Sequence, residues 1–200
     1  MLLDRLALLF GMTDVLTEYR MLSTLSDPEQ EVPLYLSGEA VKTIRQLLAR
    51  ELTLALACER TMLSASVFFL ANAKDKALLY EFRRSRNVLV RMTDGLQRTF
   101  HILGEVVSEQ PCETLALHFR HDQEALEHIP EGVGREMHLI LSMQKALQYN
   151  IAQIDGAMLL GGQLGLKGIL STFAPVLNEK RTLQTNLVQI CRNIVSRSAS

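Results

Sequence analysis

Apolar residues recur every three or four positions over most of this chain, which is the spacing of one face of an α-helix. The carboxyl-terminal part shows the pattern most clearly. It predicts two long helices, with apolar positions over 133–158 and 169–194, joined at Gly161 and Gly162. One charged residue interrupts the apolar positions of the second helix, which are Ile169, Phe173, Val176, Lys180, Leu183, Leu187, Ile190 and Ile194.

The amino-terminal part separates from the rest at a proline-containing linker. Residues 1–25 carry the pattern of a shorter amphipathic helix, and residues 26–37 contain two prolines and three acidic residues. Such a composition interrupts a helix and favours a boundary between parts of a chain. We therefore predict an amino-terminal helix with its linker over residues 1–36 and a separate helical bundle over residues 37–200.

Three further helices are expected between the linker and the two carboxyl-terminal helices. They are placed over 37–71, over 75–103 with Asp75 as the N-cap, and over 111–128 with Pro111 in the first turn. Four long helices with one short connecting helix indicate an all-α fold, an antiparallel four-helix bundle with an extra amino-terminal helix.

Composition and charge narrow the class of protein. Hydrophobic residues make up 48% of the chain and the net charge is −1, which argues against a surface that binds nucleic acid. Every uninterrupted apolar stretch is far shorter than the roughly 20 residues that span a membrane, so no membrane segment is expected. The three cysteines, Cys58, Cys112 and Cys191, form no CxxC pair and favour a reducing compartment, so a cytoplasmic location is expected.

Residues 39–195 contain, in this order, the motifs LLARELTLALACERTML, RTFHILGE, QPCETL, QKALQYNIA and LGLKGILSTFAPVLNEK. In these five motifs the chain resembles the YciF-type ferritin-like family of bacterial stress proteins. The resemblance implies a ferritin-like bundle, a dimeric assembly, and a metal site of carboxylates and histidines between the helices.

The chain departs from the family at the positions that the resemblance assigns to metal ligands. Glu59 and Glu179 keep a carboxylate, whereas Lys180 stands beside Glu179 at a paired acidic position. The other ligand positions correspond to Ser85, Val88, Met92, Leu147 and Asn150. An independent test agrees, because a di-iron bundle uses Glu-x-x-His twice and no histidine of this chain has a glutamate three residues before it.

Two other groups of residues offer alternatives. His118, His121 and Asp122 share one face of the short helix at a spacing that suits a metal, although the polar surroundings favour a solvated surface. A strip of arginines on the preceding helix suits an acidic partner or a phosphate, although a solvated face is the favoured interpretation. The strip consists of Arg83, Arg84, Arg86, Arg91 and Arg98.

These observations favour a metal-free, non-catalytic member of the ferritin-like class that acts as a homodimer or binds a protein partner through its amino-terminal helix. No cofactor, nucleic acid or membrane is expected. The alternative is a di-metal carboxylate oxidase or peroxide-handling protein that uses iron or manganese, with Glu59 and Glu179 among an unusual ligand set.

The central hypothesis concerns Glu59 and Lys180, which both occupy apolar helix faces. A carboxylate in a dry interior is costly unless a cation accompanies it. The ammonium group of a lysine is such a cation, on a side chain long enough to reach a facing helix. We therefore predict that Lys180 replaces the charge of the lost metal and forms a buried ion pair with Glu59. The alternative is that Lys180 extends into solvent and Glu59 pairs with Arg60 or water.

Overall fold

The computed structural model describes residues 37–107 and 110–198 and contains five helices over these residues, with no strand. They are α3 (Gly38–Asn72), α4 (Lys76–Leu103), α5 (Glu113–His128), α6 (Val133–Gln163) and α7 (Lys167–Ser198). The predicted all-α bundle with a short connecting helix is thereby confirmed. The chain divides into units 1–37 and 38–200, and the predicted amino-terminal helix and linker, 1–36, lie outside the described residues.

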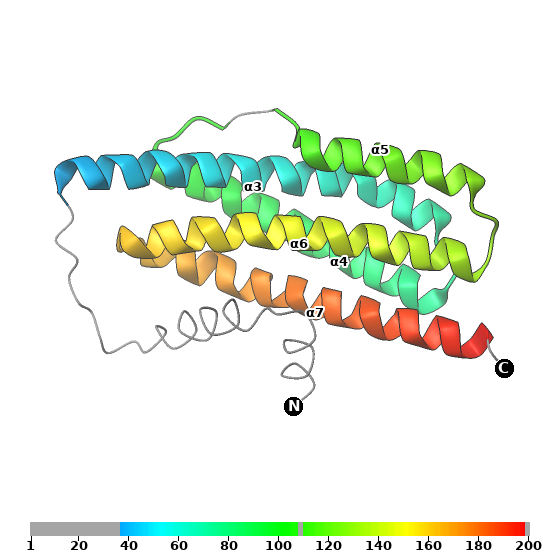
Figure 1. The fold of residues 1–200 in the computed structure, drawn as a ribbon. Coiled ribbons are helices and arrows are strands. Elements are labelled where there is room, and N and C mark those ends of the chain that lie inside the picture. The colour runs from blue at the N-terminus through cyan, green and yellow to red at the C-terminus, as the bar shows by residue number, and fades with distance from the viewer. Residues whose placement is uncertain (1–36, 108–109, 199–200) are drawn as a thin grey trace, which may run out of the picture. The chain divides into compact units, whose positions relative to one another are not determined.

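The four long helices form a closed ring of neighbours. Helix α3 packs on α4 and α6, and α7 packs on the same two helices from the other side. Figure 1 shows that each neighbouring pair is antiparallel, whereas α4 and α6 run in the same direction. This arrangement requires one crossover along the length of the bundle, and α5 makes it by packing outside α3 and α6. A single long crossover is the topology of ferritin-like bundles.

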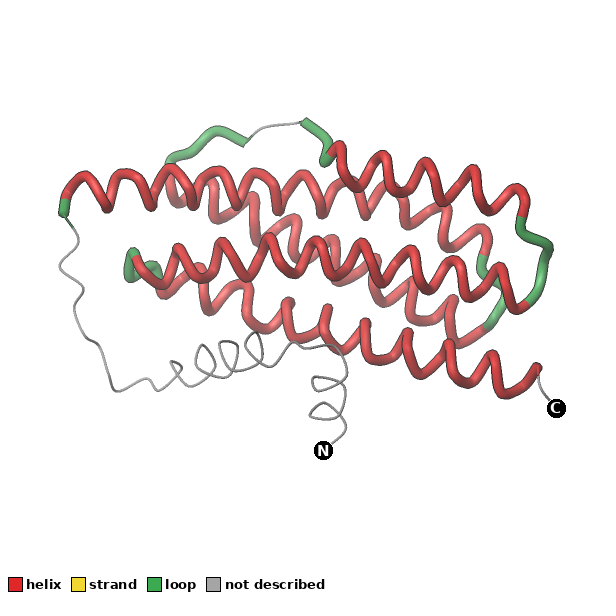
Figure 2. The backbone as a smooth tube through the Cα atoms, in the orientation of Figure 1, coloured by secondary structure: helices red, strands yellow, loops and turns green. Residues whose placement is uncertain are grey.

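Capping groups set the ends of the helices at short loops, which are drawn green in Figure 2. Asp75 caps α4 as predicted, because its Oδ1 accepts hydrogen bonds of 2.9 and 3.0 Å from the amides of Ala77 and Leu78. Gly104 ends α4 with a φ of 69°, a left-handed conformation that glycine adopts without strain.

Two predicted boundaries were wrong. Helix α6 continues through Gly161 and Gly162, and the turn comes at Gly165, whose φ is 68°. Gly161 serves a close approach instead, because a Cβ atom there would lie 3.1 Å from Cγ2 of Ile169 on α7. Pro111 precedes the N-cap residue Cys112 and is not in the first turn of α5.

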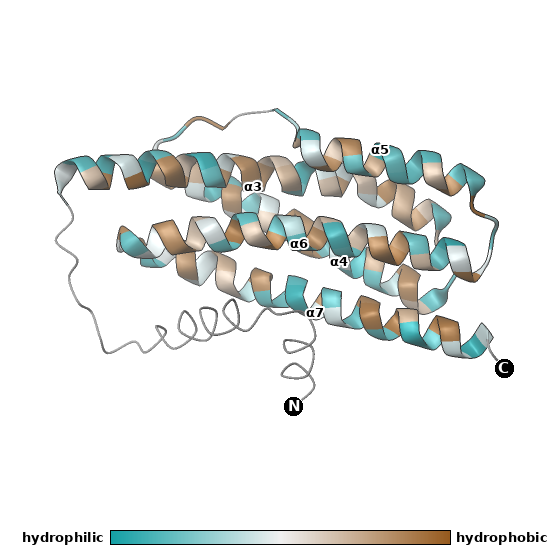
Figure 3. Cartoon of the chain, in the orientation of Figure 1, coloured by the Kyte–Doolittle hydropathy of each residue, from teal (hydrophilic) through white to brown (hydrophobic). Residues whose placement is uncertain are grey.

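The apolar core consists of two clusters, one in each half of the bundle. On α6 the boundary between the clusters falls between Leu147 and Ile151, and on α7 it falls between Leu177 and Leu183. Figure 3 shows apolar and polar bands alternating along every long helix, as expected for helices that bury one face. The residues between the two clusters on α6 and α7 include Asn150 and Lys180, both of which are buried.

Helix α3 is the one described helix that is long and apolar enough to cross a membrane by length and composition. Its inward face is buried in the bundle, and the central helix of a soluble protein has the same length and composition.

Candidate functional site

A buried ion pair occupies the centre of the bundle. Lys180 of α7 donates hydrogen bonds of 2.7 and 2.9 Å to Oε1 and Oε2 of Glu59 on α3. It donates a third, of 2.6 Å, to Oδ1 of Asn150 on α6. All three side chains are 0% exposed. Each proton of the ammonium group therefore has an acceptor, and three helices meet at this cation.

The electrostatics of the pair follow from its burial. Burial raises the pKa of Glu59, and hydrogen bonding and the positive charge of Lys180 only partly oppose this. Burial also lowers the pKa of Lys180, against the negative charge of Glu59. Desolvation thus acts against the charged form of both groups, and each depends on its partner to stay ionised.

Asn150 is the third member of the cluster, but only part of its side-chain amide is hydrogen-bonded. Its Oδ1 atom accepts from Lys180, and its presence favours the charged form of Glu59. Its Nδ2 amide, however, makes no hydrogen bond that meets normal geometry. The amide therefore contributes mainly as a third acceptor for the lysine, and the ion pair supplies most of the interaction.

The centre does not fit a di-metal site. Both oxygens of Glu59 already accept hydrogen bonds from Lys180, so its carboxylate is occupied by a cation of the protein. Among the described residues, no three His, Cys, Asp or Glu side chains converge closely enough to hold a metal ion. The remaining ligand positions implied by the family are buried but carry no ligand oxygen or nitrogen suited to a metal; they are Ser85, Val88, Met92 and Leu147.

Glu179, the second ligand-type carboxylate, does not join this centre. Its Oε2 lies 2.6 Å from Nη2 of Arg91 on α4, and 38% of its side chain is exposed. Residues 179 and 180 are adjacent on α7, and a helix turns by about 100° per residue, so the two side chains point in different directions. The structure brings Glu59 and Lys180 together and leaves Glu179 at the surface.

A second polar cluster joins α5 to α6 and differs from the solvated surface expected from the sequence. Asp122 is buried, at 8% exposure, and accepts a short hydrogen bond from the hydroxyl of Ser142. Its carboxylate also lies 3.1 Å from Nε2 of His118 and 3.5 Å from Nε2 of His138. Only His121 of the predicted group faces solvent. Sequence reasoning missed His138 because it lies on another helix.

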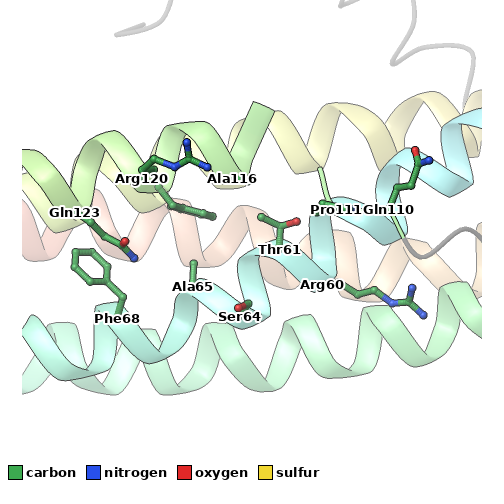
Figure 4. Close-up of a pocket in the computed structure, with 11 residues that line it drawn as sticks. Arg60, Thr61, Ser64, Ala65, Phe68, Gln110, Pro111, Ala116, Arg120 and Gln123 are labelled. Carbon is green, nitrogen blue, oxygen red and sulfur yellow. The ribbon is translucent and has the colours of Figure 1, made fainter. Parts of the chain in front are cut away.

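A pocket of about 470 Å³ lies between α3 and α5. Figure 4 shows Thr61 and Phe68 of α3 below it and Arg120 and Gln123 of α5 above it. The guanidinium group of Arg60 extends away from that of Arg120, so the two cations do not converge on one anion position. The pocket is open and partly apolar, and it lies beside the loop that leads into α5.

The arrangement of the helices is shared with two solved structures. The E. coli stress protein YciF has a TM-score of 0.72 and 18% sequence identity over 78% of this chain and 98% of its own. YcfI from Rhodopseudomonas palustris, described as a candidate structural protein, has a TM-score of 0.68 and 18% identity over 76% of this chain and 97% of its own. At this level of identity the likeness establishes the fold alone.

The sequence itself places the chain in a family. No curated protein matches it. A family described as a domain of unknown function, DUF892, matches residues 43–200, which include nearly all of α3 and everything after it. This match over most of the chain shows that the protein belongs to the DUF892 family, and its fold is the one seen in YciF.

Proposed function

We propose that this protein is a metal-free, non-catalytic helical bundle with a structural, stress-related role. The observation that carries the proposal is the position of the Lys180 ammonium group, which hydrogen-bonds to both oxygens of Glu59 at the bundle centre. Because a side chain of the protein already balances the buried carboxylate, the fold is complete without a metal ion.

The relatives support this class of role. One similar structure is that of a stress protein, and the other is that of a candidate structural protein. We extend the proposal to a homodimer in the cytoplasm, since the family resemblance implies a dimer and the described cysteines are free thiols. Light scattering on the full chain measures the assembly directly, and a mass of one chain would contradict the dimer.

Metal analysis tests the central claim. The protein is purified from cultures supplemented with iron and manganese, and both metals are measured per chain. We expect amounts far below one equivalent, unchanged in Glu59→Ala and in the surface control Glu179→Ala. The alternative, a di-metal oxidase or peroxide-handling protein, requires one or more equivalents that Glu59→Ala loses and Glu179→Ala keeps.

A further inference from the structure

Two cysteines that are far apart in the sequence touch in the fold. The Sγ atoms of Cys58 on α3 and Cys112 at the start of α5 are 3.3 Å apart. Both thiols are free, and they are 0% and 5% exposed. The third cysteine, Cys191, lies on α7 and is half-buried. The contact joins the connecting helix to the bundle beside the central ion pair, since Cys58 immediately precedes Glu59.

Two hydrogen bonds through the side chain of Thr61 hold Cys112 against the turn of α3 that carries Cys58. The amide of Cys112 donates a 3.1 Å hydrogen bond to Oγ1 of Thr61, which in turn donates 2.8 Å to the carbonyl of Ala57. One turn of α3 therefore carries Cys58 and also anchors Cys112. A disulfide bond is about 2.05 Å long, so the sulfur atoms need to approach by little more than 1 Å.

We propose that Cys58 and Cys112 form a dithiol site that reacts with peroxides and closes to a disulfide, which fixes the start of α5 to α3. The oxidant is hydrogen peroxide or a small organic hydroperoxide. This modification site is separate from the ion pair, and it does not depend on the structural role proposed above.

The reaction has two steps. The Cys112 thiolate attacks one peroxide oxygen, which forms an S–O bond, breaks the O–O bond and releases hydroxide that takes up the thiol proton as water. Cys58 sulfur then attacks the Cys112 sulfenic sulfur, which forms the S–S bond and releases a second water. Two thiols lose two electrons and two protons, and hydrogen peroxide is reduced to two waters.

The surroundings assign Cys112 as the attacking residue and Cys58 as the resolving residue. Pro111 and Thr61, which neighbour Cys112 in sequence and in space, line the pocket between α3 and α5 (Figure 4). This pocket is the route that the proposal assigns to the oxidant. Cys58 lies deeper, at 0% exposure against 5% for Cys112, and suits the resolving role.

Mass spectrometry of the full chain tests the proposal. Fully reduced protein is treated with hydrogen peroxide under native conditions, and the remaining thiols are then alkylated in denaturant. We expect two of the three thiols to disappear and a peptide that links Cys58 to Cys112 to appear. The intact mass should fall by two hydrogen atoms, and dithiothreitol should restore it. The denaturant midpoint of unfolding should rise on oxidation and return on reduction.

Serine variants test the assignment of roles. Cys191→Ser should form the same link. In Cys58→Ser the Cys112 sulfenic acid should be trapped by dimedone, whereas in Cys112→Ser no label should appear on Cys58. If either variant fails to fold, wild type and Cys191→Ser still decide the main claim. Thiols that survive peroxide sufficient to oxidise the methionines, or a link that involves Cys191, would overturn it.

Discussion

Removing one member of the Glu59–Lys180 pair should destabilise the protein far more than removing both. The single substitutions are Glu59→Leu and Lys180→Met, which keep approximately the volume of each side chain, and the third variant combines them. Each single change leaves the remaining group, either charged or forced into its neutral form, in a fully buried position with no opposite charge. The double change leaves apolar side chains where two ions were.

The distances allow the magnitude to be worked out. At 2.7 Å, with an effective dielectric constant of about 20, the attraction between the two charges is about 6 kcal/mol. Removing each ion from water costs several kcal/mol, so the intact pair is close to neutral for stability. The single variants should each lose about 3–5 kcal/mol, and the double variant should lie within about 2 kcal/mol of wild type.

Equilibrium unfolding in urea, followed by helical circular dichroism, gives the four free energies of a double-mutant cycle. The coupling between the two sites should exceed about 3 kcal/mol. Arg91 and Glu179 provide a matched control, because their 2.6 Å contact is equally short but their side chains are 51% and 38% exposed. For that pair the coupling should stay below about 1 kcal/mol.

Equal coupling in the two cycles would refute this reasoning, because burial is the main difference between the pairs. Single variants that each lose only about 0.5 kcal/mol would refute it as well, since changes of that size are typical of surface positions. If a single variant is too unstable to fold, Glu59→Gln keeps a hydrogen-bonding group and gives a smaller loss with the same sign.

Three other changes test the remaining features. Asp75→Ala removes the N-cap of α4 and should cost about 1 kcal/mol near neutral pH. Burial raises the pKa of Asp75, but hydrogen bonds from Leu78 and Arg197 outweigh this and lower the pKa overall. The stabilisation from Asp75 is therefore present above about pH 4 and is lost as the pH falls further. Urea unfolding at a series of pH values measures this loss. Asp122→Asn should cost about 2 kcal/mol and speed hydrogen exchange in α5, because a charged acceptor between α5 and α6 is lost; unchanged exchange would contradict this. Removing residues 1–31 should leave a cooperatively folding bundle but change the assembly measured by light scattering, and loss of folding would place that segment in the core.

The periodicity of the sequence predicted the helices because each one has to bury a face in the same four-helix core. On α7 every predicted position but one is buried, the exception being Val176, which is partly buried while its neighbour Leu177 faces the core. The charge of Lys180 stood out for the same reason, as a polar residue on an apolar helix face, although the spacing left open whether its long side chain reaches solvent.

The same periodicity could not predict which turns of different helices meet. Asn150 was identified only as a family ligand position, and nothing in the spacing indicated that it accepts from Lys180. The contact between Cys58 and Cys112 and that between Asp122 and His138 depend on how α5 lies on the bundle. A helical repeat gives the direction of a side chain around its own axis, but it gives no information about the offset between helices.

The ion pair between Glu59 and Lys180 bears on this offset, that is, on how far one helix is displaced along its axis relative to its neighbours. Apolar periodicity alone distinguishes weakly between the native register and one shifted by one turn, about 5.4 Å, because apolar side chains would again face the two apolar clusters. Such a shift would separate Lys180 from Glu59 and leave two unpaired ions in the interior, at a cost of several kcal/mol. The pair therefore adds little to stability in the native register but disfavours the shifted ones, as a buried polar residue does in a coiled coil. A metal bound by carboxylates from several helices imposes the same constraint, and in the metal-free bundle that we propose Lys180 takes over that part.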